Sequence, residues 1–190
     1  MSKSLPARSA QEQLLISTAA DRALARSDMR FLNGKRVFVD GFYLEAYDAP
    51  YVVGKLRNIV AFHGGKLVEK EGDSDVTFEV RSGGLSLNET TFLIGIPSLT
   101  LFFLGTGLET PELNIFKMLK QRGVAKLSFF GYDTRDRKLL FSSGVRRGSS
   151  RATSYWVFLL GPFTFDNMSK LPPEHSGYGY SLERQPPPKE

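Results

Sequence analysis

Residues 36–69, RVFVDGFYLEAYDAPYVVGKLRNIVAFHGGKLVE, decide the predicted fold. The first five residues, with apolar Val37, Phe38 and Val39 between Arg36 and Asp40, are typical of a short strand. Asp48-Ala49-Pro50 indicates a helix start, because proline is well tolerated in the first helical turn. Apolar residues then recur at helical spacing until Gly64-Gly65 ends the helix: Val52, Leu56, Ile59, Val60 and His63. Because residues 66–69 resemble a second strand, the stretch predicts a strand–helix–strand (βαβ) unit.

Both flanks of this stretch extend the same architecture. Ser9 and Glu12 have the spacing of a capping box, which predicts a helix from there to about Arg26. Residues 75–82 alternate between apolar and polar side chains, so we expect a strand with one face in water. A sheet that combines such a strand with a βαβ unit is mixed.

The C-terminal half is predicted to begin irregularly. Polar, glycine-containing residues 83–91 indicate a loop. Thr110-Pro111-Glu112 is a second helix-start signal, and Gly123 is the expected stop of that helix.

A β-hairpin is predicted next, from residues 124–132 and 138–145 around the turn 133–136. A last strand is expected over 154–160, before Gly161-Pro162. The predicted fold class is therefore α/β (α+β), with a mixed β-sheet containing a βαβ unit, an N-terminal helix and a C-terminal β-hairpin.

The domain organisation follows from length and composition. A chain of 190 residues is long enough for one domain with a real core. We predict a flexible arm over 1–8, a single domain over 9–170, and a mobile, proline-rich tail over 171–190. The opening sequence lacks the apolar core of a signal peptide, so we expect no export signal within it.

The composition excludes several chemistries. There is no cysteine, which rules out disulfides, thiolate catalysis and cysteine-based metal sites. The only two histidines, His63 and His175, are expected at a helix end and in the tail. No G-x-S-x-G element occurs, and the glycines of 105–107 lack the lysine of a phosphate loop. We therefore predict no catalytic, cofactor-binding or metal-binding residue, and an enzyme remains an alternative only through Asp40 or Glu45, at the end of the first strand.

The net charge of +5 allows attraction to nucleic acid, anionic lipid or cell-wall polymer. Hairpin pairing is expected to place the cations of 135–138 at one end and those of 146–151 at the other. A divided cluster of this kind disfavours nucleic acid as a partner.

The most apolar stretch is FLIGIPSLTLFFL, residues 92–104. Its 13 residues are fewer than the ~20 that a membrane-spanning helix needs. Two interpretations stay open: a buried core segment, or a surface that contacts lipid or protein. The candidate contact residues, including an aromatic pair suited to a half-wet site, are Phe92, Ile94, Leu99, Leu101, Phe102, Phe103, Tyr155 and Trp156.

An ordered series of segments resembles an uncharacterised family of bacterial lipoproteins. The segments are SAQEQLLISTAADRAL, GKRVFVD, YVVGKLR, SDVTFEVRSGGL, LIGIP, FKMLKQRGVAKLSFFGYD and the late GPF. The resemblance implies an exported protein that is anchored to an envelope membrane by an N-terminal lipidated cysteine. This sequence departs from that pattern, since it has neither leader nor cysteine. More distantly, it is similar to the small α/β domains of periplasmic assembly lipoproteins, including the curli-pore and cell-wall-synthase-activator types.

These observations lead to one preferred function and two alternatives. We expect a non-catalytic binding or scaffolding domain of the bacterial cell envelope, whose partner is a protein, lipid or cell-wall material. The first alternative is a self-assembling or membrane-contacting subunit that uses residues 92–104, with a homo-oligomer as one form of self-assembly. The second is a hydrolytic enzyme. The expected location is the periplasmic side of a membrane if a leader and lipidated cysteine have been removed, and the cytoplasm otherwise.

Overall fold

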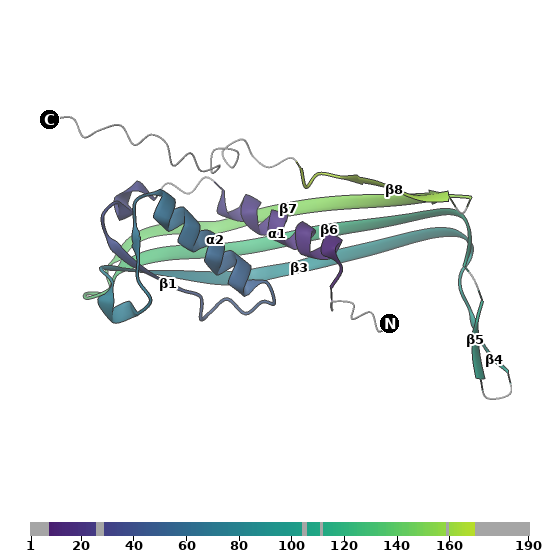
Figure 1. Ribbon diagram of the computed structural model, residues 1–190, viewed down its shortest axis with the longest axis horizontal. Coiled ribbons are helices and arrows are strands. Elements are labelled where there is room, and N and C mark those ends of the chain that lie inside the picture. Colours follow the sequence, from purple (N-terminus) through teal and green to yellow (C-terminus); the bar gives the residue numbers. More distant parts are fainter. Residues whose placement is uncertain (1–7, 26–28, 104–105, 111, 159, 170–190) are drawn as a thin grey trace, which may run out of the picture.

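A computed structural model describes residues 8–25, 29–103, 106–110, 112–158 and 160–169. It has two helices and a six-stranded sheet of order β2-β1-β3-β6-β7-β8, with β4 and β5 forming a separate two-stranded ribbon (Figure 1). The elements are α1 (Ala10–Leu24), β1 (Arg36–Asp40), α2 (Ala49–Phe62), β2 (Lys66–Leu67), β3 (Val76–Ile96), β4 (Thr100–Phe103), β5 (Thr106–Glu109), β6 (Leu113–Asp133), β7 (Leu139–Val157) and β8 (Leu160–Asp166), with 3₁₀ turns η1 (Arg30–Leu32) and η2 (Glu71–Asp73).

The sheet is mixed, as predicted. β1 pairs in parallel with β2 and β3, whereas β3, β6, β7 and β8 pair antiparallel. The mixed α/β class is thereby confirmed. α2 connects β1 to β2, and Arg36 lies opposite Lys66 in that pair.

Both helices begin and end where local signals place them. The Ser9 hydroxyl accepts a hydrogen bond from the Glu12 amide at 3.2 Å, and the Glu12 carboxylate accepts one from the Ser9 amide at 2.8 Å. α2 carries Pro50 in its first turn, and His63 Nδ1 lies 2.9 Å from the Ile59 carbonyl oxygen at its end. The capping box and the helix-end histidine are therefore confirmed.

The core lies between the two helices and one face of the sheet. Phe78 and Phe129 are fully buried there, and their rings lie 5.8 Å apart. Gly123 and Gly148 bring the sheet into close contact with α1, since a Cβ at either position would collide with the helix backbone at Leu15 and Ala19 respectively. The absent side chains let the helix lie directly on β6 and β7.

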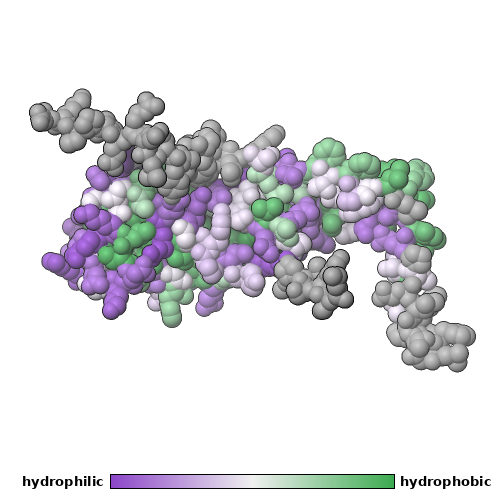
Figure 2. All heavy atoms as spheres, in the orientation of Figure 1, coloured by the Kyte–Doolittle hydropathy of each residue, from purple (hydrophilic) through white to green (hydrophobic). Residues whose placement is uncertain are grey.

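The helices cover one end of the sheet and leave the other end bare (Figure 1). β3, β6 and β7 continue far beyond α1 and α2, and the β4–β5 ribbon projects from the far end of these strands (Figure 1). We call this part the uncovered end, formed by residues 86–96, 113–122, 151–157 and 160–166. The space-filling view shows apolar residues gathered there, whereas the helical end is mostly hydrophilic (Figure 2).

Three predictions for the C-terminal half are wrong. Residues 83–91 form no loop but continue β3, with Leu85 opposite Ala125 and Leu87 opposite Gly123. Residues 113–123 form no helix but the start of β6, which pairs with β3 on one side and β7 on the other. Gly161-Pro162 does not end a strand but lies within β8, an edge strand in which proline is tolerated.

The predicted hairpin has the right turn, but its strands are much longer than expected, since β6 has 21 residues and β7 has 19. Most of the expected arm and the whole tail, residues 1–7 and 171–190, lie outside the described residues.

Candidate functional site

The strand register assigns side chains of the uncovered end, and of the adjoining residues 123–126 and 147–150, to two faces. Gly123 and Gly148 face α1, so residues directly opposite them share that face. Side chains alternate along a strand, so the even-numbered residues from Phe116 to Lys126 point away from the helices. We call this the outer face. It includes the partners of these residues on β3, β7 and β8: Ser86, Asn88, Thr90, Phe92, Ile94, Arg147, Ser149, Arg151, Thr153, Tyr155, Val157, Leu160, Phe163 and Phe165.

An aromatic row crosses the outer face, with one ring from each of four strands. The ring centroids of Phe92 and Phe116 lie 6.3 Å apart, those of Phe116 and Tyr155 6.2 Å, and those of Tyr155 and Phe165 6.1 Å. Phe92 is 49% exposed and Phe165 is 68% exposed. Further exposed apolar side chains extend the row: Ile94, Val157, Leu160 and Phe163. Together they form an apolar patch with nothing described packed on it.

A basic belt lies beside this row on the same face. It consists of five exposed cations: Lys120, Arg122, Lys126, Arg147 and Arg151. Arg122 lies directly opposite Arg151, and Lys126 directly opposite Arg147. None of the outer-face residues named above is acidic, so the belt keeps its positive charge unneutralised within that face.

The structure brings some predicted contact residues together and separates others. Phe92 and Ile94 lie on the outer face beside Tyr155, and both are about half exposed, as is Leu99 beyond the end of β3. These three residues of the apolar stretch are therefore not core residues. Only the backbone of Leu101, Phe102 and Phe103 is described, in β4, and their side chains lie outside the described part of the structure.

Trp156 does not belong to the outer face. It lies opposite Lys117 on the helix-facing side, and the Lys117 ammonium is 5.5 Å from its ring centroid. Lys117 also forms an ion pair of 2.9 Å with Glu112. The side chains of the adjacent residues Tyr155 and Trp156 thus point to opposite faces of the sheet, because side chains alternate along β7.

Several residues of this surface were not predicted. Phe116 and Phe165 were missed because residues 113–122 were interpreted as a helix and 161–162 as a strand end. Lys120 and Arg122 were missed for the same reason. The alternation of residues 116–122 and the pattern Phe163-Thr164-Phe165 are the signals that an extended interpretation would have used.

The divided basic cluster is confirmed in outline. Residues 135–138 lie at the β6–β7 turn and residues 146–151 lie within β7, well separated along the hairpin. Arg146 faces the other way and donates to the Ala25 carbonyl oxygen.

Asp40 and Glu45, the residues of the alternative catalytic site, lie at the end of β1 and in the loop that follows it. Asp40 accepts a hydrogen bond from the Phe42 amide at 2.8 Å, and Glu45 is exposed. Neither residue lines either of the two hollows characterised on the surface. Within the described ranges, no group of three histidine, aspartate or glutamate side chains is placed to hold a metal ion.

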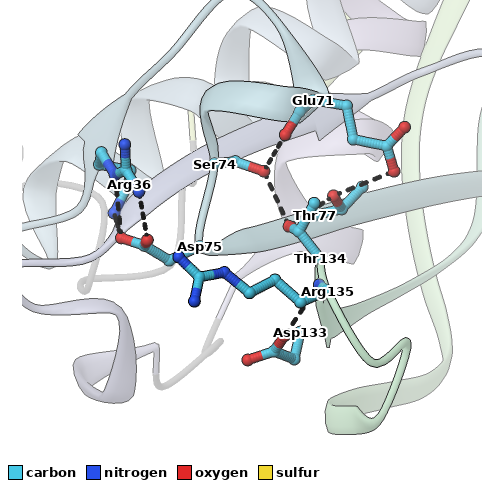
Figure 3. A network of polar contacts seen from close by, with 8 residues as sticks. All are labelled: Arg36, Glu71, Ser74, Asp75, Thr77, Asp133, Thr134 and Arg135. Carbon is cyan, nitrogen blue, oxygen red and sulfur yellow. Dashed lines mark hydrogen bonds and ion pairs between the residues drawn. The ribbon is translucent and has the colours of Figure 1, made fainter.

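A polar network occupies the opposite end of the sheet (Figure 3). Arg36 forms an ion pair of 2.7 Å with Asp75, and the hydrogen bonds from Arg36 lower the pKa of Asp75 to about 2. The Thr134 hydroxyl lies within hydrogen-bond distance of both Ser74 and Thr77. These contacts tie η2 and the β6–β7 turn to the start of β3, so we assign the network a structural role.

Residues 3–170 match the sequence profile of DUF6655, a family of unknown function. The chain belongs to this family. The expectation of an uncharacterised family is thereby confirmed. No curated protein matches the chain.

The DUF6655 match spans α1 to β8, so it includes both the aromatic row and the basic belt. No helix in the described part of this DUF6655 protein is long and apolar enough to cross a membrane. The outer face combines an exposed aromatic row with an unneutralised basic belt, and we therefore take it as the candidate functional surface.

Proposed function

We propose that this DUF6655 protein is a non-catalytic binding protein that attaches to an anionic lipid bilayer through the outer face of its uncovered end. The membrane belongs, in this proposal, to the bacterial cell envelope. The single observation that carries the proposal is the aromatic row beside an unneutralised basic belt on one uncovered face.

The aromatic row supports contact with the boundary between headgroups and acyl chains. Large exposed apolar patches mark contact surfaces. Tyrosine is typical of the membrane–water interface because its ring is apolar and its hydroxyl is polar. Tyr155 stands in the middle of the row, with Phe116 and Phe165 beside it.

The position of the belt favours lipid over an uncharged apolar partner. Lys120 lies two residues along β6 from Met118, the residue opposite Tyr155, which corresponds to about 7 Å. Arg122 and Arg151 lie about 14 Å from the same point. If the strands run along the membrane normal with the row at the acyl boundary, these offsets place the cations level with or just beyond the phosphate layer. Each cation near an anionic surface contributes about 1 kcal/mol.

Vesicle flotation tests the proposal. We expect the full chain to bind vesicles containing phosphatidylglycerol, to bind phosphatidylcholine vesicles weakly, and to lose affinity as salt rises. Phe92→Asp together with Phe165→Asp will lower the affinity by about tenfold or more, since burial of one phenyl ring contributes about 1.5–3 kcal/mol.

Phe42→Asp is the matched control, because Phe42 is 79% exposed and lies in the loop after β1. All variants should keep the wild-type melting temperature, which shows that binding and not folding has changed. Equal vesicle binding by the double variant and the control would contradict the proposal, as would capture by a protein partner with no binding to vesicles.

A second candidate function, self-assembly, is favoured by the edge of β3. β1 pairs only with residues 76–79 of β3, so among the described strands residues 80–96 have a neighbour on one side only, β6. The last part of this edge, TTFLIGI at residues 90–96, has no charge and no proline. Such an edge is a ready template for a strand of a second copy.

Light scattering after size exclusion, with and without mild detergent, tests this second function. We expect an oligomer that Thr90→Lys with Thr91→Lys converts to monomer, because charges along an edge oppose pairing. Leu14→Lys, at an exposed position of α1, should leave the oligomer intact. A wild-type chain that is strictly monomeric at all concentrations would exclude self-assembly.

A further inference from the structure

A hollow lies beside the edge of β7 where β8 ends, and three of its lining residues, Arg122, Ser149 and Arg151, belong to the outer face. Its volume is about 310 Å³, and it is lined by Arg122, Ser149, Ser150, Arg151 and Asn167. β8 pairs with β7 as far as Asp166 opposite Ala152, so among the described strands β7 has no partner on that side from residue 151 back. The hollow therefore lies against the edge of β7, inside the basic belt.

The wall of the hollow is held in place by several contacts. The Arg151 amide donates to the Asn167 side-chain oxygen at 2.8 Å, and the Asn167 amide donates to the Arg151 carbonyl oxygen at 3.1 Å. Arg22 of α1 donates to the carbonyl oxygens of Ser149 and Asn167. These contacts use backbone atoms of Ser149, Arg151 and Asn167, so they fix the wall of the hollow without engaging the guanidinium groups of Arg122 and Arg151.

Arg122 and Arg151 are directly opposite each other on neighbouring antiparallel strands. Like charges at such positions have Cβ atoms about 5 Å apart and destabilise a sheet. Among the described residues, neither guanidinium forms an ion pair, and the Ser149 hydroxyl has no hydrogen-bond partner. An anionic ligand placed between the two guanidinium groups would reduce this repulsion, and a doubly charged anion would neutralise both charges.

We infer that this hollow binds the phosphate group of a small phosphorylated headgroup, with Arg122 and Arg151 as its two cationic ligands. The planar guanidinium forms paired hydrogen bonds with phosphate oxygens. The volume is at the lower end of small-molecule sites, so it has room for a phosphate with a short polar group such as glycerol. Ser149 and Asn167 supply a hydroxyl and an amide for the hydroxyls of that group. The lipid form of this ligand rests on the proposed function, whereas the phosphate site itself does not.

The test uses Arg122→Gln, Arg151→Gln and the double variant, with Arg135→Gln in the exposed β6–β7 turn as the control. Soluble glycerol 3-phosphate and inorganic phosphate are titrated by calorimetry, and phosphatidylglycerol vesicles by flotation. We expect saturable binding of glycerol 3-phosphate that each single variant weakens by about tenfold and the double variant abolishes. We also expect the ligand-free melting temperature of Arg122→Gln to equal or exceed that of wild type, because the like-charge repulsion is gone.

The arms separate the possible sources of phosphate. Binding to vesicles but not to soluble phosphates, with the same loss in the two arginine variants, assigns the site to a lipid-held phosphate and supports the inference. Soluble binding without any vesicle binding supports the site but refutes the proposed membrane function. The inference is overturned if both arginine variants behave like Arg135→Gln with every probe, or if neither soluble phosphates nor vesicles bind to the wild-type chain.

Discussion

Replacing Phe78 with alanine will lower the free energy of unfolding by about 3–5 kcal/mol. Phe78 is fully buried, and the centroid of its ring lies 5.8 Å from that of Phe129 and 6.0 Å from that of Phe141. Gly131, directly opposite on β6, leaves space that the ring fills. Loss of the ring removes the centre of an aromatic cluster between the sheet and the helices. Urea denaturation followed by circular dichroism measures the change.

Phe42→Ala is the control for this effect, because Phe42 is largely exposed. A surface substitution of this kind changes the free energy of unfolding by about 0.5 kcal/mol or less. A loss of under about 1 kcal/mol for Phe78→Ala would mean that the cluster is not the centre of the core.

The second large effect is expected from Gly148→Val. The Cβ atom of any side chain at this position collides with the carbonyl oxygen of Ala19 in α1, so the helix must move away from the sheet. Overpacking in a core costs about 1–3 kcal/mol, and here the obstacle is backbone rather than a flexible side chain. We therefore expect a loss at or above the upper end of this range, measured by thermal unfolding.

Gly54→Ala is the matched control for the glycine substitution. Gly54 lies within α2, and nothing lies within 4 Å of the place where its Cβ would stand. Alanine in a helix is more favourable than glycine by about 0.5–1 kcal/mol, so this variant will be slightly more stable than wild type. If Gly148→Val were equally harmless, α1 would not pack on β7 as described.

The helices and the first strands were predictable from sequence because their signals are local. Ser9 and Glu12 bond to each other's backbone within one turn of α1. Asp48-Ala49-Pro50 and Gly64 mark the limits of α2 within one or two residues. The alternation of residues 76–80 correctly indicated a strand, but the expected water-facing side is wrong there, since Thr77 and Glu79 are buried as well as Val76, Phe78 and Val80.

The long strands were not predictable from local signals, because pairing over a large sequence distance decides them. Leu119 lies opposite Thr91 on one side and Ser154 on the other, at least 28 positions away along the chain. Thr110 and Glu112 resemble a helix start, yet hydrogen bonding to two neighbouring strands outweighs that preference.

The candidate site was predictable only in part for the same reason. Phe92, Ile94 and Tyr155 were found because the first two lie in a conspicuously apolar stretch and the third in an aromatic pair. Phe165 and the opposition of Arg122 and Arg151 depend on register, which no single segment reveals.

The length of β3 has a consequence for how this protein can change. Its 21 residues extend over about 70 Å, so the far end of the sheet lies well away from the aromatic cluster around Phe78. Substitutions separated by more than about 10 Å usually act additively. The effect on stability of a substitution near Ile96 should therefore simply add to that of one near Phe78, so the two ends of this sheet can be altered independently.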